Sequence, residues 1–209
     1  IRPEWLVWLP CLVSGLNLAC QISGKPGDEV LTPKPIYTPF MTAPNNAGRT
    51  TVTVPLKLTG DRWVLDTKAL EDSITPYSKT LLLCNPQNPA GTVYTKAELL
   101  EIYSICKKHS LIICSDEIHC DLILNTQKKH IPIGTIQGSD TDQIITLMSA
   151  SKTFNVAGLS CGFAVIPNPN IREKYKNAMA GLMPDINLFG QIATMKAFTE
   201  CRDWLREQV

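Results

Sequence analysis

Charged residues are scarce in this sequence, and neither sign of charge is gathered into a run. They make up 19% of the 209 residues, and the formal net charge is +1. Binding to nucleic acid or to an anionic membrane surface requires concentrated lysine and arginine, because the partner presents phosphate groups. The composition therefore argues against nucleic acid and against a membrane surface as the main partner.

Histidine is also scarce, and no C-x-x-C pair is present. The chain has three histidines and eight cysteines, a pattern that supports neither a zinc site, nor any other metal site, nor a dithiol redox motif. The cysteines stand in apolar runs, as Cys84, Cys114 and Cys161 do. We therefore expect them to be small buried hydrophobic residues of a reduced, cytoplasmic protein.

A convincing signal peptide or membrane-spanning segment is lacking as well. Residues 5–20 are apolar, but Pro10 and Gly15 interrupt them, and the run is shorter than the roughly 20 residues of a spanning helix. The residues before it do not form a positively charged segment, and no convincing cleavage site follows. Because the chain opens without a methionine, we expect it to be part of a longer protein.

What the sequence does contain is an alternation of extended and helical patterns. Short apolar or β-branched runs predict strands at residues 29–32, 51–56, 80–84, 111–115, 144–148 and 161–166. Helical spacing and capping residues predict helices at 11–22, 66–74 and 95–109, and over most of the chain from 171 onward with a break near Pro184. This alternation predicts an α/β fold, a three-layer sandwich in which a mostly parallel sheet carries helices on both faces.

Three of the predicted strands are followed by unusual polar residues. Asn88, Asp116 and Lys152 come after the strands at 80–84, 111–115 and 144–148. Ligands of open α/β sheets bind at the carboxyl ends of the strands, so these side chains could converge on one pocket.

Each of these residues also has an ordinary structural interpretation. Asn88 stands in an Asn-Pro pair, which is common in turns. Asp116 could cap a following helix, and most lysines such as Lys152 are solvated surface groups. The functional interpretation depends on the three occurring together, as an amine, a carboxylate and an amide.

Three sequence runs carry a resemblance to a known family. They read N-P-Q-N-P-A-G at 85–91, S-D-E-I-H-C-D-L at 115–122 and S-A-S-K-T-F-N-V-A-G-L at 149–159. Together they resemble the fold-type-I pyridoxal-phosphate (PLP) enzymes, and more narrowly the cystathionine β-lyase branch related to class I/II aminotransferases. Order and spacing match across essentially the whole chain. The resemblance implies that residues 1–209 form the PLP-binding large domain, whose C-terminal helix leads toward a small domain outside this chain.

The resemblance implies a role for each strand-end residue. Lys152 would hold pyridoxal 5'-phosphate as a Schiff base and then remove the substrate Cα proton. Asp116 would keep the pyridine nitrogen protonated, which makes the ring an electron sink. Asn88 would donate a hydrogen bond to the phenolate oxygen of the ring. His119 stands where aminotransferases usually carry a tyrosine that reaches the same oxygen, although a histidine that only packs is the alternative.

The remaining expected contacts surround the ring and the phosphate. Tyr37, in a proline-rich loop, matches the aromatic residue that stacks on the cofactor, or it merely packs. The phosphate would sit on the helix start at Cys11 and Leu12, where backbone N–H groups are free. Ser149 and Ser151 could add hydroxyl donors.

One departure from the aminotransferases bears on the reaction. Many of them carry an arginine eight residues after the lysine, where this chain has Ser160, and related lyases often lack that arginine too. The resemblance therefore favours β-elimination from L-cystathionine or another cysteine S-conjugate, which yields pyruvate, ammonia and a thiol. It also implies a homodimer and a substrate-carboxylate arginine outside this chain. The alternatives are an aminotransferase and a non-catalytic PLP-binding regulatory protein.

Overall fold

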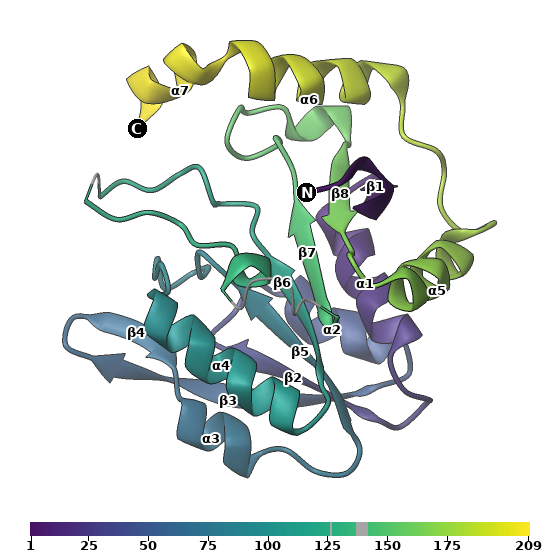
Figure 1. Cartoon of the computed structure of the whole chain (residues 1–209), viewed down its shortest axis with the longest axis vertical. Helices are drawn as coiled ribbons and strands as arrows, with labels where there is room; N and C mark the ends of the chain where they lie inside the picture. Colours follow the sequence, from purple (N-terminus) through teal and green to yellow (C-terminus); the bar gives the residue numbers. More distant parts are fainter. Residues whose placement is uncertain (126, 137–141) are drawn as a thin grey trace.

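A single eight-stranded sheet forms the centre of the computed structural model, which describes residues 1–125, 127–136 and 142–209 (Figure 1). The strand order is β1-β8-β7-β6-β5-β2-β3-β4. The strands are β1 (Leu6–Leu9), β2 (Glu29–Lys34), β3 (Thr50–Thr59), β4 (Arg62–Leu65), β5 (Ser78–Cys84), β6 (Ile112–Asp116), β7 (Ile144–Met148) and β8 (Gly162–Val165). The adjacent pairs β7–β6, β6–β5, β5–β2 and β2–β3 are parallel, whereas the pairs β1–β8, β8–β7 and β3–β4 are antiparallel. The prediction of a mostly parallel sheet is confirmed.

Helices cover both faces of this sheet. They are α1 (Leu12–Ile22), α2 (Pro39–Asn46), α3 (Thr67–Asp72), α4 (Lys96–Lys108), α5 (Pro169–Met179), α6 (Leu188–Glu200) and α7 (Arg202–Gln208), with short 3-10 helices η1 (Pro3–Trp5), η2 (Ile133–Thr135) and η3 (Ala157–Leu159). Along β5, Leu81 and Leu83 belong to the core shared with α3 and α4. Leu82 and Cys84 belong to the core shared with α1, α2 and α5. Because a strand buried on both faces must be apolar throughout, this arrangement accounts for the continuous apolar run, and the predicted three layers are confirmed.

Local capping signals produce the helix starts that the sequence predicts. Asp66 accepts hydrogen bonds from the N–H groups of Lys68 and Ala69 at the start of α3. Thr95 and Glu98 form the reciprocal capping box of α4, which satisfies backbone donors that have no partner within the helix.

Three elements and three cysteines differ from the prediction. Strands β1 and β4 have four residues each, too few for a visible alternation. Tyr37 lies in an irregular segment as expected, but Pro39, which was expected in that loop, is the first residue of helix α2, where a missing N–H costs little. All eight cysteines are free thiols and five are buried as expected, but Cys120 and Cys201 are half-buried and Cys11, which precedes α1, is exposed.

The C-terminal helices lie over the segment that follows β7. In Figure 1, α6 and α7 run across the top of the molecule, above β7 and β8. The Asn187 side chain donates to the Leu159 carbonyl at 2.8 Å, and Phe154 packs in one apolar cluster with Ala197 and Leu205. None of the helices in the described part of the chain has both the length and the apolarity that a membrane crossing needs.

We predict that Gly190→Ala weakens the attachment of α6. A Cβ at Gly190 would lie 2.5 Å from the Leu159 carbonyl oxygen, a backbone atom that cannot rotate away. Overpacking of this kind costs about 1–3 kcal/mol, which chemical denaturation should measure as a lower free energy of unfolding. Gly158→Ala is the matched control, because a Cβ there meets nothing within 4 Å. Equal stabilities of the two variants would contradict the prediction.

Candidate functional site

A cavity of about 410 Å³ opens at the carboxyl ends of β5, β6 and β7. These strands are parallel neighbours, so the segments that leave them begin at the same edge of the sheet. The lining includes every residue that the sequence singled out for the cofactor: Cys11, Leu12, Tyr37, Asn88, Asp116, His119, Ser149, Ser151 and Lys152. The fold therefore brings together residues that lie up to 141 positions apart in the sequence, from Cys11 to Lys152 (152 minus 11).

Asp116 is the last residue of β6 and forms a buried wall of the cavity. The residue is 5% exposed, and its side chain accepts a hydrogen bond from the Ile118 N–H at 3.1 Å. Its carbonyl oxygen accepts from the Asn85 N–H at 3.0 Å, which ties β6 to the end of β5. The alternative that Asp116 caps a helix is wrong, since a turn follows the strand instead.

Burial makes the ionised form of Asp116 costly. It raises the pKa of this carboxyl to about 7. The Ile118 N–H lowers the pKa, the negative charge of Glu117 raises it, and the positive charge of Lys152 lowers it. A carboxylate whose ionisation is opposed by burial gains most from a cation placed beside it. The cavity wall is thus suited to a positively charged ligand group.

Lys152 lies in a tight turn after β7. The turn is closed by hydrogen bonds from the Phe154 N–H to the Ala150 carbonyl at 2.9 Å and from the Val156 N–H to the Ser151 carbonyl at 3.1 Å. Lys152 itself is exposed and faces the cavity. Its positive charge, together with burial as the larger cause, lowers the pKa of His119. His119 is therefore a neutral hydrogen-bonding group at neutral pH.

Asn88 and Tyr37 are held in register by contacts between their two loops. The Tyr37 N–H donates to the Asn88 carbonyl at 3.1 Å. Gln87, which is buried, donates from Nε2 to the Pro35 carbonyl at 2.9 Å. The Tyr37 side chain is 47% exposed at the cavity, so one face of its ring is available to a flat ligand.

The start of α1 forms one end of the cavity, where Cys11 and Leu12 line it. Cys11 is the N-cap of an 11-residue helix, and the first N–H groups of a helix have no partner within it. Ser149 needs a correction: its hydroxyl donates to the Cys161 carbonyl at 2.7 Å and accepts from the Ser151 N–H at 3.0 Å. The hydroxyl hydrogen of Ser149 is thus used within the protein. The Ser151 hydroxyl is therefore the better candidate to donate a hydrogen bond to a ligand in the cavity.

Cys84 and Ser160 also line the cavity, although neither was a predicted contact of the cofactor. Cys84 lies directly opposite Asp116 in the β5–β6 ladder, and burial and the Asp116 charge raise the pKa of its thiol to about 12. The position of Cys84 at the end of a predicted strand is the sequence feature that could have identified it as a lining residue. Ser160 also lines the cavity, in a left-handed backbone conformation with φ 46°. Among the described lining residues Lys152 is the one Lys or Arg side chain.

The fold and the cavity define an α/β protein with a small-molecule site at the carboxyl ends of parallel strands. The profile of the family described as aminotransferase class I and II matches residues 1–200. The chain belongs to the aminotransferase class I and II family.

The relatives include enzymes with this architecture. Cystathionine beta-lyase PatB from Bacillus subtilis (strain 168) is 34% identical over 215 residues, which cover 100% of this chain and 54% of that protein. The crystal structure of OvoB superposes with a TM-score of 0.96 at 43% identity, covering 100% of this chain and 55% of that one. Cystalysin from Treponema denticola, whose structure contains pyridoxal 5'-phosphate, gives 0.93 at 34% identity, covering 99% and 53%. The chain spans about half the length of the curated relatives it matches.

We predict that Asp116→Asn removes a pH dependence from stability. The pKa of Asp116 is about 7 in the folded chain and about 3.9 when unfolded. Between these values the folded state binds more protons, so its stability falls as pH rises from about 4 to about 7. At pH 8 the ligand-free variant should be more stable than the wild type by about 1–3 kcal/mol, and at pH 4 nearly equal.

Urea unfolding at pH 4, 6 and 8 measures this difference. Asp203→Asn is the control, because that carboxylate is on the surface with its side chain 88% exposed. Parallel stability curves for the wild type and Asp116→Asn would contradict the assignment of a buried, reluctantly ionised carboxyl.

Proposed function

We propose that residues 1–209 form the cofactor-binding domain of a PLP-dependent carbon–sulfur β-lyase. The substrates would be L-cystathionine or related cysteine S-conjugates, and the products pyruvate, ammonia and a thiol. The observation that carries the proposal is the meeting of Lys152, Asp116 and Asn88 in one cavity, beside the start of α1. The relatives named as a cystathionine beta-lyase and as a PLP-containing cystalysin support it.

The residues of the cavity fit pyridoxal 5'-phosphate. A volume of about 410 Å³ lies within the usual range of small-molecule sites. Asp116 accepts one side-chain hydrogen bond among the described residues, which leaves acceptor capacity for a protonated ring nitrogen. The free N–H groups at the start of α1 suit the phosphate, and the exposed Tyr37 ring suits the flat face of the cofactor.

When bound, the cofactor supplies an electron sink for the negative charge that develops at the substrate Cα. Asp116 keeps a negative charge beside the ring nitrogen and so favours its protonated form. Asn88 and His119, which both line the cavity, would supply hydrogen bonds to the phenolate oxygen of the ring. Lys152 provides the amine that carries the cofactor and afterwards takes the proton from the substrate Cα.

The choice of lyase over aminotransferase rests on two positions. His119 replaces the usual tyrosine and Ser160 the usual arginine, and both features belong to the lyase branch of the resemblance. Both reactions start with removal of the Cα proton, and the lyase differs because a thiolate then leaves from Cβ. An aminotransferase remains the second candidate, because the family profile carries that description.

Three further assignments belong to the proposal. The substrate carboxylate would be bound by an arginine outside residues 1–209, in a second, smaller domain. The protein would act as a homodimer, as fold-type-I enzymes commonly do. A cytoplasmic location is supported by eight cysteines that are all free thiols, since oxidising compartments favour disulfides.

We predict that Lys152→Ala abolishes attachment of the cofactor. The wild-type protein at its full natural length, mixed with pyridoxal 5'-phosphate, should show an absorbance band near the edge of the visible range. Borohydride should remove that band and leave the cofactor fixed to the protein at Lys152, as peptide mass spectrometry can verify. Lys174→Ala, which changes a surface lysine outside the cavity, should behave as wild type. If the wild type forms no band, the proposal of a PLP-dependent enzyme fails at its first step.

We predict that the full-length enzyme releases pyruvate and a thiol from L-cystathionine without any keto acid. Pyruvate is measured by a coupled dehydrogenase and the thiol by a disulfide dye. The reaction needs no amino-group acceptor because ammonia leaves the substrate by hydrolysis. Transfer of the amino group to an added keto acid, with no thiol released, would instead establish the aminotransferase.

A further inference from the structure

A buried polar network lies beside the cavity, around the residue that follows Asp116. Glu117 has a side chain that is 0% exposed and does not line the cavity. Neighbouring side chains of an extended chain point to opposite sides, so Asp116 faces the cavity while Glu117 faces the core that contains Ile133.

Three hydrogen bonds satisfy the Glu117 carboxylate. Oε1 accepts from the Ser115 hydroxyl at 3.0 Å and from the Ile133 N–H at 3.1 Å. Oε2 is 2.7 Å from Nε2 of His130, whose side chain is 7% exposed. A carboxylate without water must be paired in this way, and loss of one partner leaves an uncompensated buried group.

The geometry of His130 identifies which hydrogen it uses. Its Nδ1 is buried and has no partner within the described residues. A doubly protonated ring would leave a buried N–H unpaired there, whereas a neutral ring with its hydrogen on Nε2 donates to Glu117. The contact is therefore a hydrogen bond that Nε2 of His130 donates to the Glu117 carboxylate.

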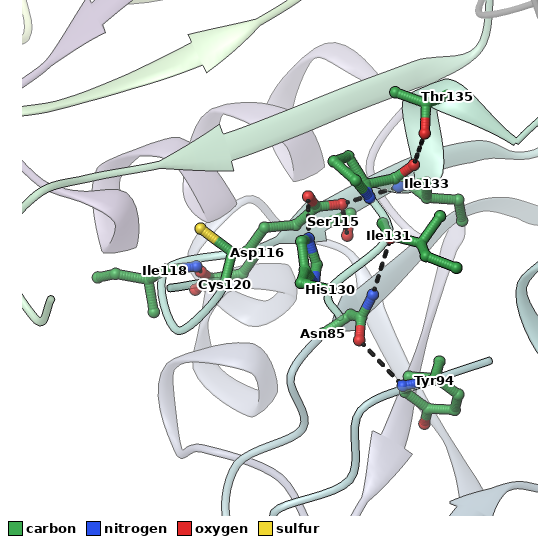
Figure 2. A network of polar contacts seen from close by, with 12 residues as sticks. Asn85, Tyr94, Ser115, Asp116, Ile118, Cys120, His130, Ile131, Ile133 and Thr135 are labelled. Carbon is green, nitrogen blue, oxygen red and sulfur yellow. Dashed lines mark hydrogen bonds and ion pairs between the residues drawn. The ribbon is translucent and has the colours of Figure 1, made fainter. Parts of the chain in front are cut away.

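The same short segment also binds the end of the neighbouring strand. Asn85 is fully buried, and its Nδ2 donates to the Ile131 carbonyl at 3.4 Å while its Oδ1 accepts from the Tyr94 N–H at 3.3 Å. Figure 2 shows Asn85 below His130 and Ile131, joined to Ile131 by a dashed line. Residues 130–133 thus bind both β6, through Glu117, and the loop that leads from β5 to Asn88.

We propose that Glu117 and His130 are a positioning pair that fixes the spacing of Asn88 and Asp116 around the cofactor ring. Both act from outside the cavity, through the segment 130–133, and neither touches the cofactor. The inference deepens the proposed function and rests on it. Even a small shift of the segment 130–133 would matter, because the residues of a functional site must be held to within about 0.5 Å of their working positions.

The test compares His130→Ala with His130→Gln in the full-length protein, using pyridoxal 5'-phosphate as the probe. Alanine removes the donor to Glu117, whereas the amide of glutamine can replace Nε2. His130→Ala should weaken cofactor binding by at least about tenfold, as loss of orienting partners commonly does, and should shift the pH midpoint of the bound cofactor's absorbance. His130→Gln should restore both to near the wild-type values.

Leu70→Ala is the control for stability alone. Leu70 lies in the same core, on α3, and is fully buried, so the variant should lower the melting temperature without changing cofactor affinity or the absorbance midpoint. His130→Asn, a milder change whose shorter amide does not reach Glu117, replaces His130→Ala if the latter does not fold and should show the same losses.

Two outcomes would overturn the inference, and they are distinguishable. If the His130 variants lose stability as Leu70→Ala does but keep wild-type affinity and midpoint, the pair is structural only. If the wild type does not bind pyridoxal 5'-phosphate, the proposed function itself fails, and the positioning role fails with it.

Discussion

The parallel pairing of β5, β6 and β7 is the constraint on which the rest of the molecule depends. Their register sets Cys84 beside Asp116, and Asp116 beside Leu147, so three strands end at one edge of the sheet. Parallel strands cannot be joined by a tight turn and need longer crossover connections, and α4 supplies the one between β5 and β6 on one face of the sheet. One backbone arrangement therefore creates the core and gathers an amine, a carboxylate and an amide into a single cavity.

Adjacent acidic residues at the end of β6 have opposite energetic roles. Glu117 turns into the core and is satisfied by Ser115, Ile133 and His130. Asp116 turns into the cavity with one side-chain hydrogen bond, and its pKa rises because burial opposes its charge. The Glu117 carboxylate stabilises the fold around it. The Asp116 carboxylate retains an unfavourable desolvation energy that a bound cation would offset. A buried carboxylate with few hydrogen-bond partners and a shifted pKa is characteristic of functional sites.

Sequence patterns predicted the parts of the molecule in which local and global preferences agree. Strand β7 matches the predicted residues 144–148, because a continuous apolar run suits a strand buried on both faces. Helix α2 was missed because Pro39 and Pro44 are read as loop residues unless their position within the helix is known. The nine candidate residues were found through strand ends and motifs, but the occupied hydroxyl of Ser149 depends on a carbonyl twelve residues away in sequence. No local pattern carries such a contact.

The charges of the cavity limit how its groups can work together. Lys152 is the one Lys or Arg side chain among the described lining residues, and Ser160, which the resemblance aligns with an arginine of many aminotransferases, carries no charge. If the proposed phosphate binds at the start of α1, backbone N–H groups and hydroxyls would hold it, and the positive charge of Lys152 would remain available for other contacts. Before a ligand binds, Lys152 lowers the pKa of Asp116. In the proposed complex, a cationic ring beside Asp116 would take over that role, and the lysine amine would be free to exchange a proton with the substrate.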